Sequence, residues 1–283
     1  MVTSPPAIGQ EKSGAEVVER ALHALGRDQL LVDLAFPGAD SPFFALDAVH
    51  DDEGHPLLID VNYRVWGSWA AMQSAGRGRR NRSWVSPFAS NLCLSLLWRS
   101  DCGIAGLGGM SLVCGVAVLR CLEQFGITSG GVQWPNDVLV NDAKLAGILI
   151  DVIGEATGSC AVIVGVGINV AMPEQASEQI GQPWTDLCSL TGMAQFPRNL
   201  LAARTLDTLL AAIGEFTASG LQGFLDDWSR YDVMAGRQVD VHLPGETVSG
   251  RACGIDETGA LLVQTASGHQ RFASGEVSVR VAP

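Results

Sequence analysis

The stretch Ala75-Gly-Arg-Gly-Arg-Arg-Asn-Arg-Ser-Trp84 contains the residue types best suited to binding an anion. Four arginines fall within six positions, and Gly76 and Gly78 alternate with the first two of them. Glycine lets a backbone approach a ligand closely, and the planar guanidinium group of arginine binds phosphate or carboxylate through paired hydrogen bonds. A solvated basic loop and a nucleic-acid patch are the alternative interpretations. The chain has no GxxxxGK[ST] phosphate loop.

Two polar groups interrupt apolar segments further along the chain. In Trp134-Pro-Asn-Asp137 the polar pair could form only a turn, or it could place Asn136 at a nucleotide and Asp137 at Mg²⁺. Lys144 opens the apolar run AKLAGILID, where a lysine is often simply solvated. Because Gly147 would let a ligand pack closely, the ammonium group could instead lie beside a phosphate and balance its charge.

The segment Gly165-Val-Gly-Ile-Asn169 is a weak match to a dinucleotide-binding fingerprint. It lacks the third glycine of that fingerprint, and no convincing helix follows it. By itself this segment therefore does not predict a dinucleotide cofactor.

The composition indicates a folded cytoplasmic protein. Of the 283 residues, 47% are hydrophobic and 17% charged, and the formal net charge of −12 argues against general binding of nucleic acids or anionic membranes. None of the seven cysteines forms a CxxC pair and most lie in apolar runs, which favours buried thiols in a reducing compartment. The N-terminal residues lack the basic and apolar regions of a secretory signal, and no window approaches about 18 uninterrupted apolar residues.

Apolar patterns predict the strands that could hold the polar groups. Residues 91–99 alternate well enough for a strand, and 160–170 form an apolar, β-branched segment expected at the centre of a sheet. Residues 138–152 contain two apolar runs around Asn141-Asp142, which predicts a hairpin with a tight turn.

Helical periodicity predicts four helices. In the segment 110–126 the apolar residues share one helical face, and Gly126 is suited to end the helix. The residues on that face are Leu112, Val113, Val116, Leu119 and Leu122. The other helices are expected at 15–26, 198–220 and 221–231.

The character of the chain changes at residue 236. Five short strands with polar or glycine-containing turns follow it, which predicts a small β-barrel-like domain. The preceding elements mix helices and strands without regular βαβ alternation, so an α+β fold is expected. We expect three parts: a partly disordered N-terminal extension at 1–35, a main domain at 36–235 and the small domain at 236–283.

Taken together, these segments closely resemble the biotin protein ligases of the monofunctional type. AGRGRR with Trp84, WPND, KLAGIL and GVGIN occur in the order of that family, and GIDETGALLV and SGEVSVR follow them. The resemblance runs from about Gln73 to the C-terminus. It implies the α+β fold of the biotin and lipoate ligases, with a mixed sheet in a catalytic domain at 36–235 and an SH3-like barrel at 236–283.

The resemblance implies an ATP-dependent enzyme that forms biotinyl-5′-AMP from biotin and ATP. It would then transfer biotin to a lysine of a biotin carboxyl carrier domain, with Mg²⁺ as a cofactor and with homodimerisation a possibility. The residues before the catalytic domain are too few for a DNA-binding winged helix, so neither a nucleic acid nor a membrane is an expected partner. The alternatives are a lipoate or octanoate ligase or transferase of the same superfamily, and a non-catalytic biotin-binding relative.

The family's motifs also assign roles to individual residues. The expected catalytic residues are Lys144, Arg77 and Arg79. These three would contact biotin and the adenylate together with Gln73, Gly76, Gly78, Trp84 and Gly147. ATP would be bound by Asn136, Asn169 and Arg280, and Mg²⁺ by Asp137.

The chain departs from the family pattern at three places. The Ser-Thr-Asn triplet that contacts the ureido ring of biotin is absent, and His50-Asp51-Asp52-Glu53 lies at about its position. Asn81 stands where a loop glycine is expected, which would stiffen the arginine loop. Gln133 stands where lysine is common, which removes one positive charge from the phosphate side.

Overall fold

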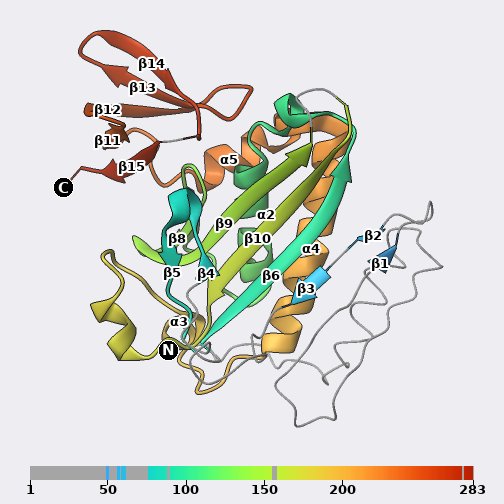
Figure 1. The fold of residues 1–283 in the computed structure, drawn as a ribbon. Helices are drawn as coiled ribbons and strands as arrows, with labels where there is room; N and C mark the ends of the chain where they lie inside the picture. The colour runs from blue at the N-terminus through green and yellow to red at the C-terminus, as the bar shows by residue number, and fades with distance from the viewer. Residues whose placement is uncertain are drawn as a thin grey trace.

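The computed structural model describes residues 49–50, 56–57, 59–61, 76–87, 90–154, 158–275 and 277–282. In this part of the chain, a large and a small antiparallel sheet are connected by helices that pack on one face of the large sheet (Figure 1). The helix predicted at 15–26 and the N-terminal extension lie outside the described residues.

The large sheet has six strands, and every pairing between them is antiparallel. In spatial order they are β3 (Ile59–Val61), β6 (Asn91–Ser100), β10 (Cys160–Asn169), β9 (Ala143–Gly154), β8 (Asp137–Val140) and β7 (Gly130–Gln133). Among the described residues, parallel contacts are limited to isolated bridges such as the one between Lys144 and Trp184. The family resemblance implies a mixed sheet, but all strand pairings in the large sheet are antiparallel. The α+β class is confirmed.

The central position predicted for residues 160–170 is confirmed, since β10 lies between β6 and β9. Val162, Val164 and Ile168 are fully buried on one face of β10, whereas Ala161, Ile163, Gly165 and Gly167 on the other face are partly exposed. This two-residue alternation is what one covered face of a sheet requires.

The hairpin predicted at 138–152 is confirmed as β8 and β9. Asn141 and Asp142 both have positive φ angles, 52° and 60°, as a tight two-residue hairpin turn requires. The short strand β7 before this hairpin was not predicted, because Gly130-Gly131 gives it little strand character.

The helices at 110–126 and 198–220 are confirmed as α2 (Met110–Glu123) and α4 (Arg198–Ser219). Gly126 ends the turn after α2 with a φ of 81°, as expected. The five residues predicted to share one apolar face of α2 are buried, and Cys114, Val118 and Cys121 on its other sides are also 0% exposed. The helix is buried all round because α4 covers its outer side, which the sequence window alone does not reveal.

The segment predicted as a helix at 221–231 begins with a 3₁₀ turn, η5 (Gly220–Phe224), and continues as α5 (Leu225–Tyr231). Within the described residues, the remaining helices are η2 (Arg79–Asn81), η3 (Ile104–Leu107), η4 (Glu174–Glu178) and α3 (Leu187–Thr191).

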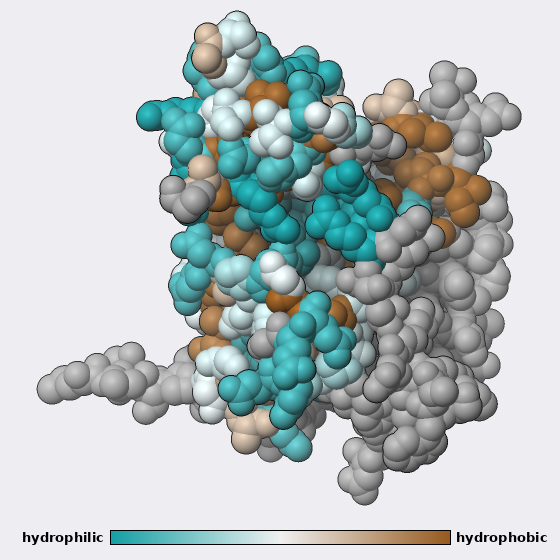
Figure 2. Space-filling model, turned by 60° about the vertical axis from the view of Figure 1, so that its left-hand side comes forward, coloured by the Kyte–Doolittle hydropathy of each residue, from teal (hydrophilic) through white to brown (hydrophobic). Residues whose placement is uncertain are grey.

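Within the described residues, Ile104–Glu123 is long and apolar enough to cross a membrane by length and composition. However, most of this segment is buried against the rest of the chain, as in the core helix of a soluble protein. Among the coloured residues of Figure 2, teal and pale residues predominate, and the brown apolar residues lie in separate areas.

The five strands predicted after residue 236 are confirmed, in the spatial order β14-β13-β12-β11-β15. Their bounds are β11 (Gln238–Leu243), β12 (Glu246–Ile255), β13 (Leu261–Thr265), β14 (Gly268–Phe272) and β15 (Ser278–Val281). The strand pairings do not close this sheet into a barrel, because β14 and β15 form its two edges.

We expect Leu96→Ala to lower the free energy of unfolding by about 2–5 kcal/mol, because the side chain is completely buried in β6 and its removal leaves a cavity. Urea denaturation measures the change. Ser95→Ala on the exposed side of the same strand is the control and should shift it by less than about 0.5 kcal/mol. Equal effects of the two substitutions would contradict this assignment of the core.

Candidate functional site

Lys144 and Asp137 form an ion pair across the β8–β9 hairpin. The ammonium nitrogen lies 2.7 Å from Asp137 Oδ1, and each side chain is 16% exposed. Gly147 leaves space beside them, since a Cβ atom there would lie 3.6 Å from Lys144 Nζ. A largely desolvated ammonium group is tolerable because the carboxylate compensates its charge.

Trp84 lies across two glycines on neighbouring strands. Gly147 and Gly167 are register partners, and a Cβ atom on either would lie 3.0 Å from the indole ring. The Lys144 ammonium is 5.3 Å from the centre of the same ring, within cation–π range. Gly167, the second glycine of the weak GVGIN match, therefore lets the Trp84 ring approach the sheet.

A small hairpin brings Trp84 to this position. It consists of β4 (Gly76–Arg77) and β5 (Ser83–Trp84), with Gly76 opposite Trp84. The backbone of Gly78 closes the loop between the strands by donating to the Arg82 carbonyl at 2.8 Å. The arginine-rich segment is thus an ordered loop at the edge of the site.

Arg79 connects three segments that are far apart in the sequence. Its guanidinium group donates to Asn136 Oδ1 at 3.3 Å, to the Gly275 carbonyl at 2.8 Å and to the Ser274 carbonyl. Burial lowers the pKa of Arg79, and the positive charges of Arg82 and Arg80 lower it further, whereas Asp137 opposes the shift. Arg79, Asn136 and Asp137 therefore belong to one charged cluster with Lys144.

Asn136 is fixed in its turn by the neighbouring strand. Its Nδ2 donates to the Ile148 carbonyl at 2.9 Å, and the Ile148 amide donates back to the Asn136 carbonyl at 2.9 Å. Ser111, in the first turn of α2, donates to the Pro135 carbonyl at 2.8 Å. These contacts present the side-chain oxygen of Asn136 to Arg79.

Asn169 lies behind the lysine and is only 3% exposed. Its amide nitrogen donates to the carbonyls of Lys144 at 3.3 Å and Thr185 at 3.0 Å, and its oxygen accepts from Asn91 at 2.8 Å. The side chain expected to contact ATP is therefore engaged within the protein, where it holds the backbone of Lys144 in place.

The small sheet also reaches this region. Arg280 in β15 donates to Gln182 Oε1 at 2.9 Å, and the next residue, Pro183, accepts from the Lys144 amide at 3.0 Å. Gln133 donates to the Val279 carbonyl at 3.4 Å, so the residue found in place of a lysine ties β7 to β15.

Some expected site residues are described only in part. Gln73 and Asp51-Asp52-Glu53 lie outside the described residues. For Gly76, Arg77, Asn81 and His50 only the backbone is described. Five groups at the site were not predicted, because single polar residues and backbone groups carry no motif: Asn91, Ser111, Thr185 and the carbonyls of Ser274 and Gly275.

Asp137 is the only expected metal ligand, and its carboxylate is paired with Lys144. No group of three or more histidine, cysteine, aspartate or glutamate side chains gathers within the described part of the chain. One carboxylate does not form a metal site by itself. It fits an Mg²⁺ ion whose other ligands are water and the phosphates of a bound nucleotide.

The chain matches two family profiles. Residues 63–169 match the "Biotin/lipoate A/B protein ligase family", and residues 235–280 match the "Biotin protein ligase C terminal domain". Together these matches include the Lys144 cluster and the small sheet.

Individual proteins are similar over most of the chain. The biotin--[acetyl-CoA-carboxylase] ligase of Paracoccus denitrificans is 32% identical over 219 residues, which cover 74% of this chain and 88% of the relative. The bifunctional ligase/repressor BirA of Salmonella typhimurium is 38% identical over 213 residues, or 75% of this chain, but the match spans only 66% of the relative.

Among solved structures, the biotin protein ligase from Aquifex aeolicus in complex with biotin and ATP is similar. Its TM-score is 0.63 and its sequence identity 26%, with 78% of this chain and 93% of that chain covered.

We expect Asn169→Ala to lower the free energy of unfolding by about 2–3 kcal/mol, because the Thr185 carbonyl loses the donor and Asn91 Nδ2 loses the acceptor that Asn169 supplies, while the Lys144 carbonyl keeps the Thr185 amide. Chemical denaturation measures this loss. The control is Asn199→Ala at an exposed position of α4, which should change the stability by no more than about 0.5 kcal/mol. A matching small change for Asn169→Ala would mean that the amide does not hold the lysine backbone.

Proposed function

This chain belongs to the biotin protein ligase family, and we propose that it forms biotinyl-5′-AMP from biotin and ATP and transfers biotin to a lysine of a carboxyl carrier domain. The observation that carries the proposal is the meeting of Arg79, Asn136, Asp137 and Lys144 in one cluster beside Trp84. Two cations, one carboxylate and an aromatic face are suited to a negatively charged acyl adenylate.

The first half-reaction needs positive charge at two places. A free carboxylate is a poor acyl donor, so its oxygen must attack the α-phosphorus of ATP, with pyrophosphate as the leaving group. Both reactants are anions, and the barrier falls if fixed cations neutralise the charge that builds up between them. We assign this role to Lys144 and Arg79, and to Arg77 by its place in the same loop.

Ligand anions would change the partners of both cations. Lys144 would exchange the Asp137 carboxylate for a phosphate or biotin carboxylate oxygen, and Arg79 would exchange neutral carbonyls for a charged acceptor. Hydrogen bonds to charged acceptors are about twice as strong as neutral ones, which favours the exchange at Arg79, whereas at Lys144 one anion replaces another. Released from Lys144, Asp137 would hold Mg²⁺, which neutralises phosphate charge when it is bound with ATP.

In the second half-reaction, the deprotonated amine of a carrier lysine attacks the acyl carbon and AMP leaves. The mixed anhydride must be kept from water until the carrier arrives. Trp84 and the β4–β5 hairpin, which lie against Gly147 and Gly167, are suited to cover it. We propose that Gln73, Gly76 and Gly78 complete this cover.

Asn136 and Arg280 are proposed to bind ATP at the border with the small sheet, with Asn169 supporting Lys144 from behind. The division into a catalytic domain at 36–235 and an SH3-like domain at 236–283 is likewise our proposal. We also propose that the protein is cytoplasmic, that it has no nucleic-acid partner and that it forms a homodimer. The free cysteines of the described residues support the cytoplasmic location.

We expect Lys144→Ala to slow biotinyl-5′-AMP formation by about 10²–10³-fold, typical of the loss of one electrostatic stabiliser. Single-turnover pyrophosphate release in the presence of biotin and MgATP measures this step. Arg204→Ala removes a cation from the outer surface of α4 and should leave the rate unchanged. A near-wild-type rate for Lys144→Ala would exclude its proposed role.

Biotin-dependent ATP–pyrophosphate exchange tests the function itself. We expect exchange with biotin and none with lipoate, followed by labelling of a carrier-domain lysine when labelled biotin is supplied. Exchange with lipoate instead would identify a lipoate enzyme. Biotin binding without any exchange would identify a non-catalytic relative.

A further inference from the structure

The turn Trp134-Pro135-Asn136 contains the side-chain oxygen of Asn136, which accepts a hydrogen bond from Arg79. This turn is held from two sides. Ser111 of α2 holds the Pro135 carbonyl on one side. On the other, the Trp134 indole nitrogen donates to the Gly259 carbonyl at 3.0 Å, across to the small sheet. Trp134 is 1% exposed, so this hydrogen bond is shielded from water.

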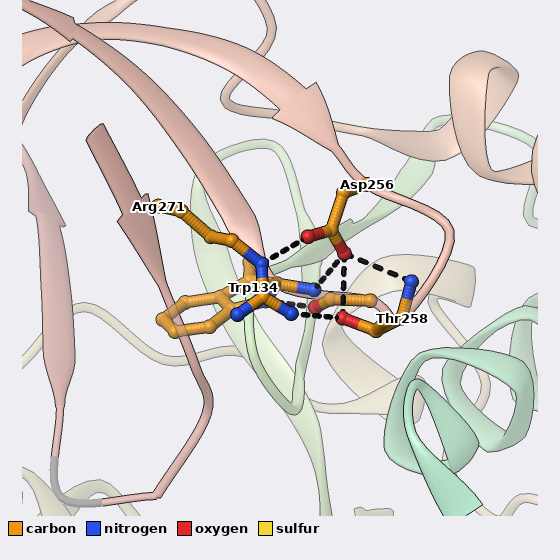
Figure 3. Close-up of polar contacts among 6 residues, drawn as sticks. Trp134, Asp256, Thr258 and Arg271 are labelled. Atoms are coloured by element: carbon orange, nitrogen blue, oxygen red, sulfur yellow. Dashed lines mark hydrogen bonds and ion pairs between the residues drawn. The ribbon is translucent and has the colours of Figure 1, made fainter. Parts of the chain in front are cut away.

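The acceptor of that hydrogen bond lies in the tight turn between β12 and β13, which Asp256 organises (Figure 3). Asp256 Oδ1 accepts from the Thr258 amide at 2.8 Å, the Thr258 hydroxyl at 2.7 Å and the Ala260 amide at 3.0 Å. Its other oxygen accepts from Arg271, which also donates to the Thr258 hydroxyl at 2.5 Å. One carboxylate thus fixes the backbone on both sides of Gly259.

These bonds keep Asp256 ionised. Burial alone would raise its pKa, but the hydrogen bonds from Arg271, Thr258 and Ala260 outweigh burial and hold the pKa well below its usual value. The carboxylate can therefore order the turn throughout the neutral pH range.

The turn sits directly against the start of α2. A Cβ atom on Gly108 would lie 2.6 Å from the Thr258 carbonyl, and one on Gly259 would lie 2.6 Å from the Gly109 Cα. Gly109 and Gly259 have φ angles of 79° and 80°, which side chains rarely adopt. Backbone therefore packs on backbone here, and a small shift of the turn would be passed to its neighbours.

We propose that Asp256 is a positioning residue for the adenylation step, acting through Gly259 and Trp134 on Asn136 and hence on Arg79. The inference rests on the proposed function. Asp256 sets the position of the Gly259 carbonyl, and that carbonyl anchors the indole of Trp134. The anchored turn then presents Asn136 to Arg79 and leads into Asp137, the partner of Lys144.

Two variants break this connection at different points. Asp256→Asn weakens the charge-assisted bonds within the turn, and Trp134→Phe keeps a smaller aromatic ring but removes the donor to Gly259. The matched control is Glu257→Gln, which removes the same charge from the same turn. Glu257 is exposed, and its carboxylate accepts none of the hydrogen bonds that hold the turn within the described residues.

Steady-state exchange kinetics give the first readout. We expect Asp256→Asn to lower kcat/KM for ATP by about 10-fold, the scale expected when reacting groups are displaced by part of an ångström. Glu257→Gln should stay within about 2-fold of the wild type. The double variant Asp256→Asn/Trp134→Phe should be no worse than the poorer single variant, because both act through one hydrogen bond.

Hydrogen exchange at the Ile148 amide gives a readout that needs no activity. This amide donates to the Asn136 carbonyl on the far side of the turn from Asp256, and its exchange should be about 10-fold faster in Asp256→Asn. Arg271→Gln keeps Asp256 but removes its charged hydrogen-bond partner, so it should also speed exchange at the Ile148 amide. It replaces Asp256→Asn in this test if that variant does not fold.

The outcomes separate the two proposals. The positioning role would be overturned if hydrogen exchange at the Ile148 amide were the same in Asp256→Asn and Glu257→Gln. Fully additive effects of Asp256→Asn and Trp134→Phe on kcat/KM would overturn it as well. A wild-type chain without biotin-dependent exchange would overturn the proposed function, while the Ile148 amide would still report on the connection from Asp256 to Asn136.

Discussion

A lysine ammonium group with most of its water removed is the constraint on which the rest of this site depends. Such a group needs a compensating charge or an aromatic face, and Lys144 has both, in Asp137 at 2.7 Å and Trp84 at 5.3 Å from the ring centre. The space for these partners exists because Gly147 and Gly167 carry no side chain. The large sheet, the β4–β5 hairpin, Gly147 and Gly167 together place the groups that compensate the charge of Lys144.

The distribution of charge around the site would favour an anionic ligand. The chain as a whole has a net charge of −12, yet Arg79, Arg80 and Arg82 lie together on one loop that reaches the lysine. Their mutual repulsion contributes to the lowered pKa of Arg79. An anionic ligand would relieve that repulsion, so binding energy is directed to the place where the reaction builds up negative charge.

Contacts between the two sheets determine how firmly this arrangement is held. Arg79 donates to carbonyls just before β15, Gln133 bonds to β15, and Trp134 bonds to the turn after β12. Each contact joins a group at the site to backbone of the small sheet. The small sheet is therefore part of the scaffold of the site.

Local sequence determined most of the elements of this protein. Alternation and helical period predicted β6, β10, α2, α4 and the five C-terminal strands, because these patterns reflect contacts between each segment and one covered face. Asn141-Asp142 predicted the β8–β9 turn for a similar local reason, its tolerance of positive φ. The motif residues were also identifiable. Asn136, Asp137 and Lys144 interrupt apolar segments, and Arg79 and Trp84 belong to the stretch rich in arginine and glycine.

Only the tertiary structure decided how those residues are used. Burial of α2 on all sides depends on α4, and the engagement of Asn169 depends on Asn91 and Thr185, which lie far from it in the sequence or carry no motif. The Gly259 carbonyl that holds Trp134 is a backbone group, and a backbone group leaves no mark in the sequence. Sequence patterns record what each segment buries, whereas a site is made by contacts between segments, which exist only after the chain has folded.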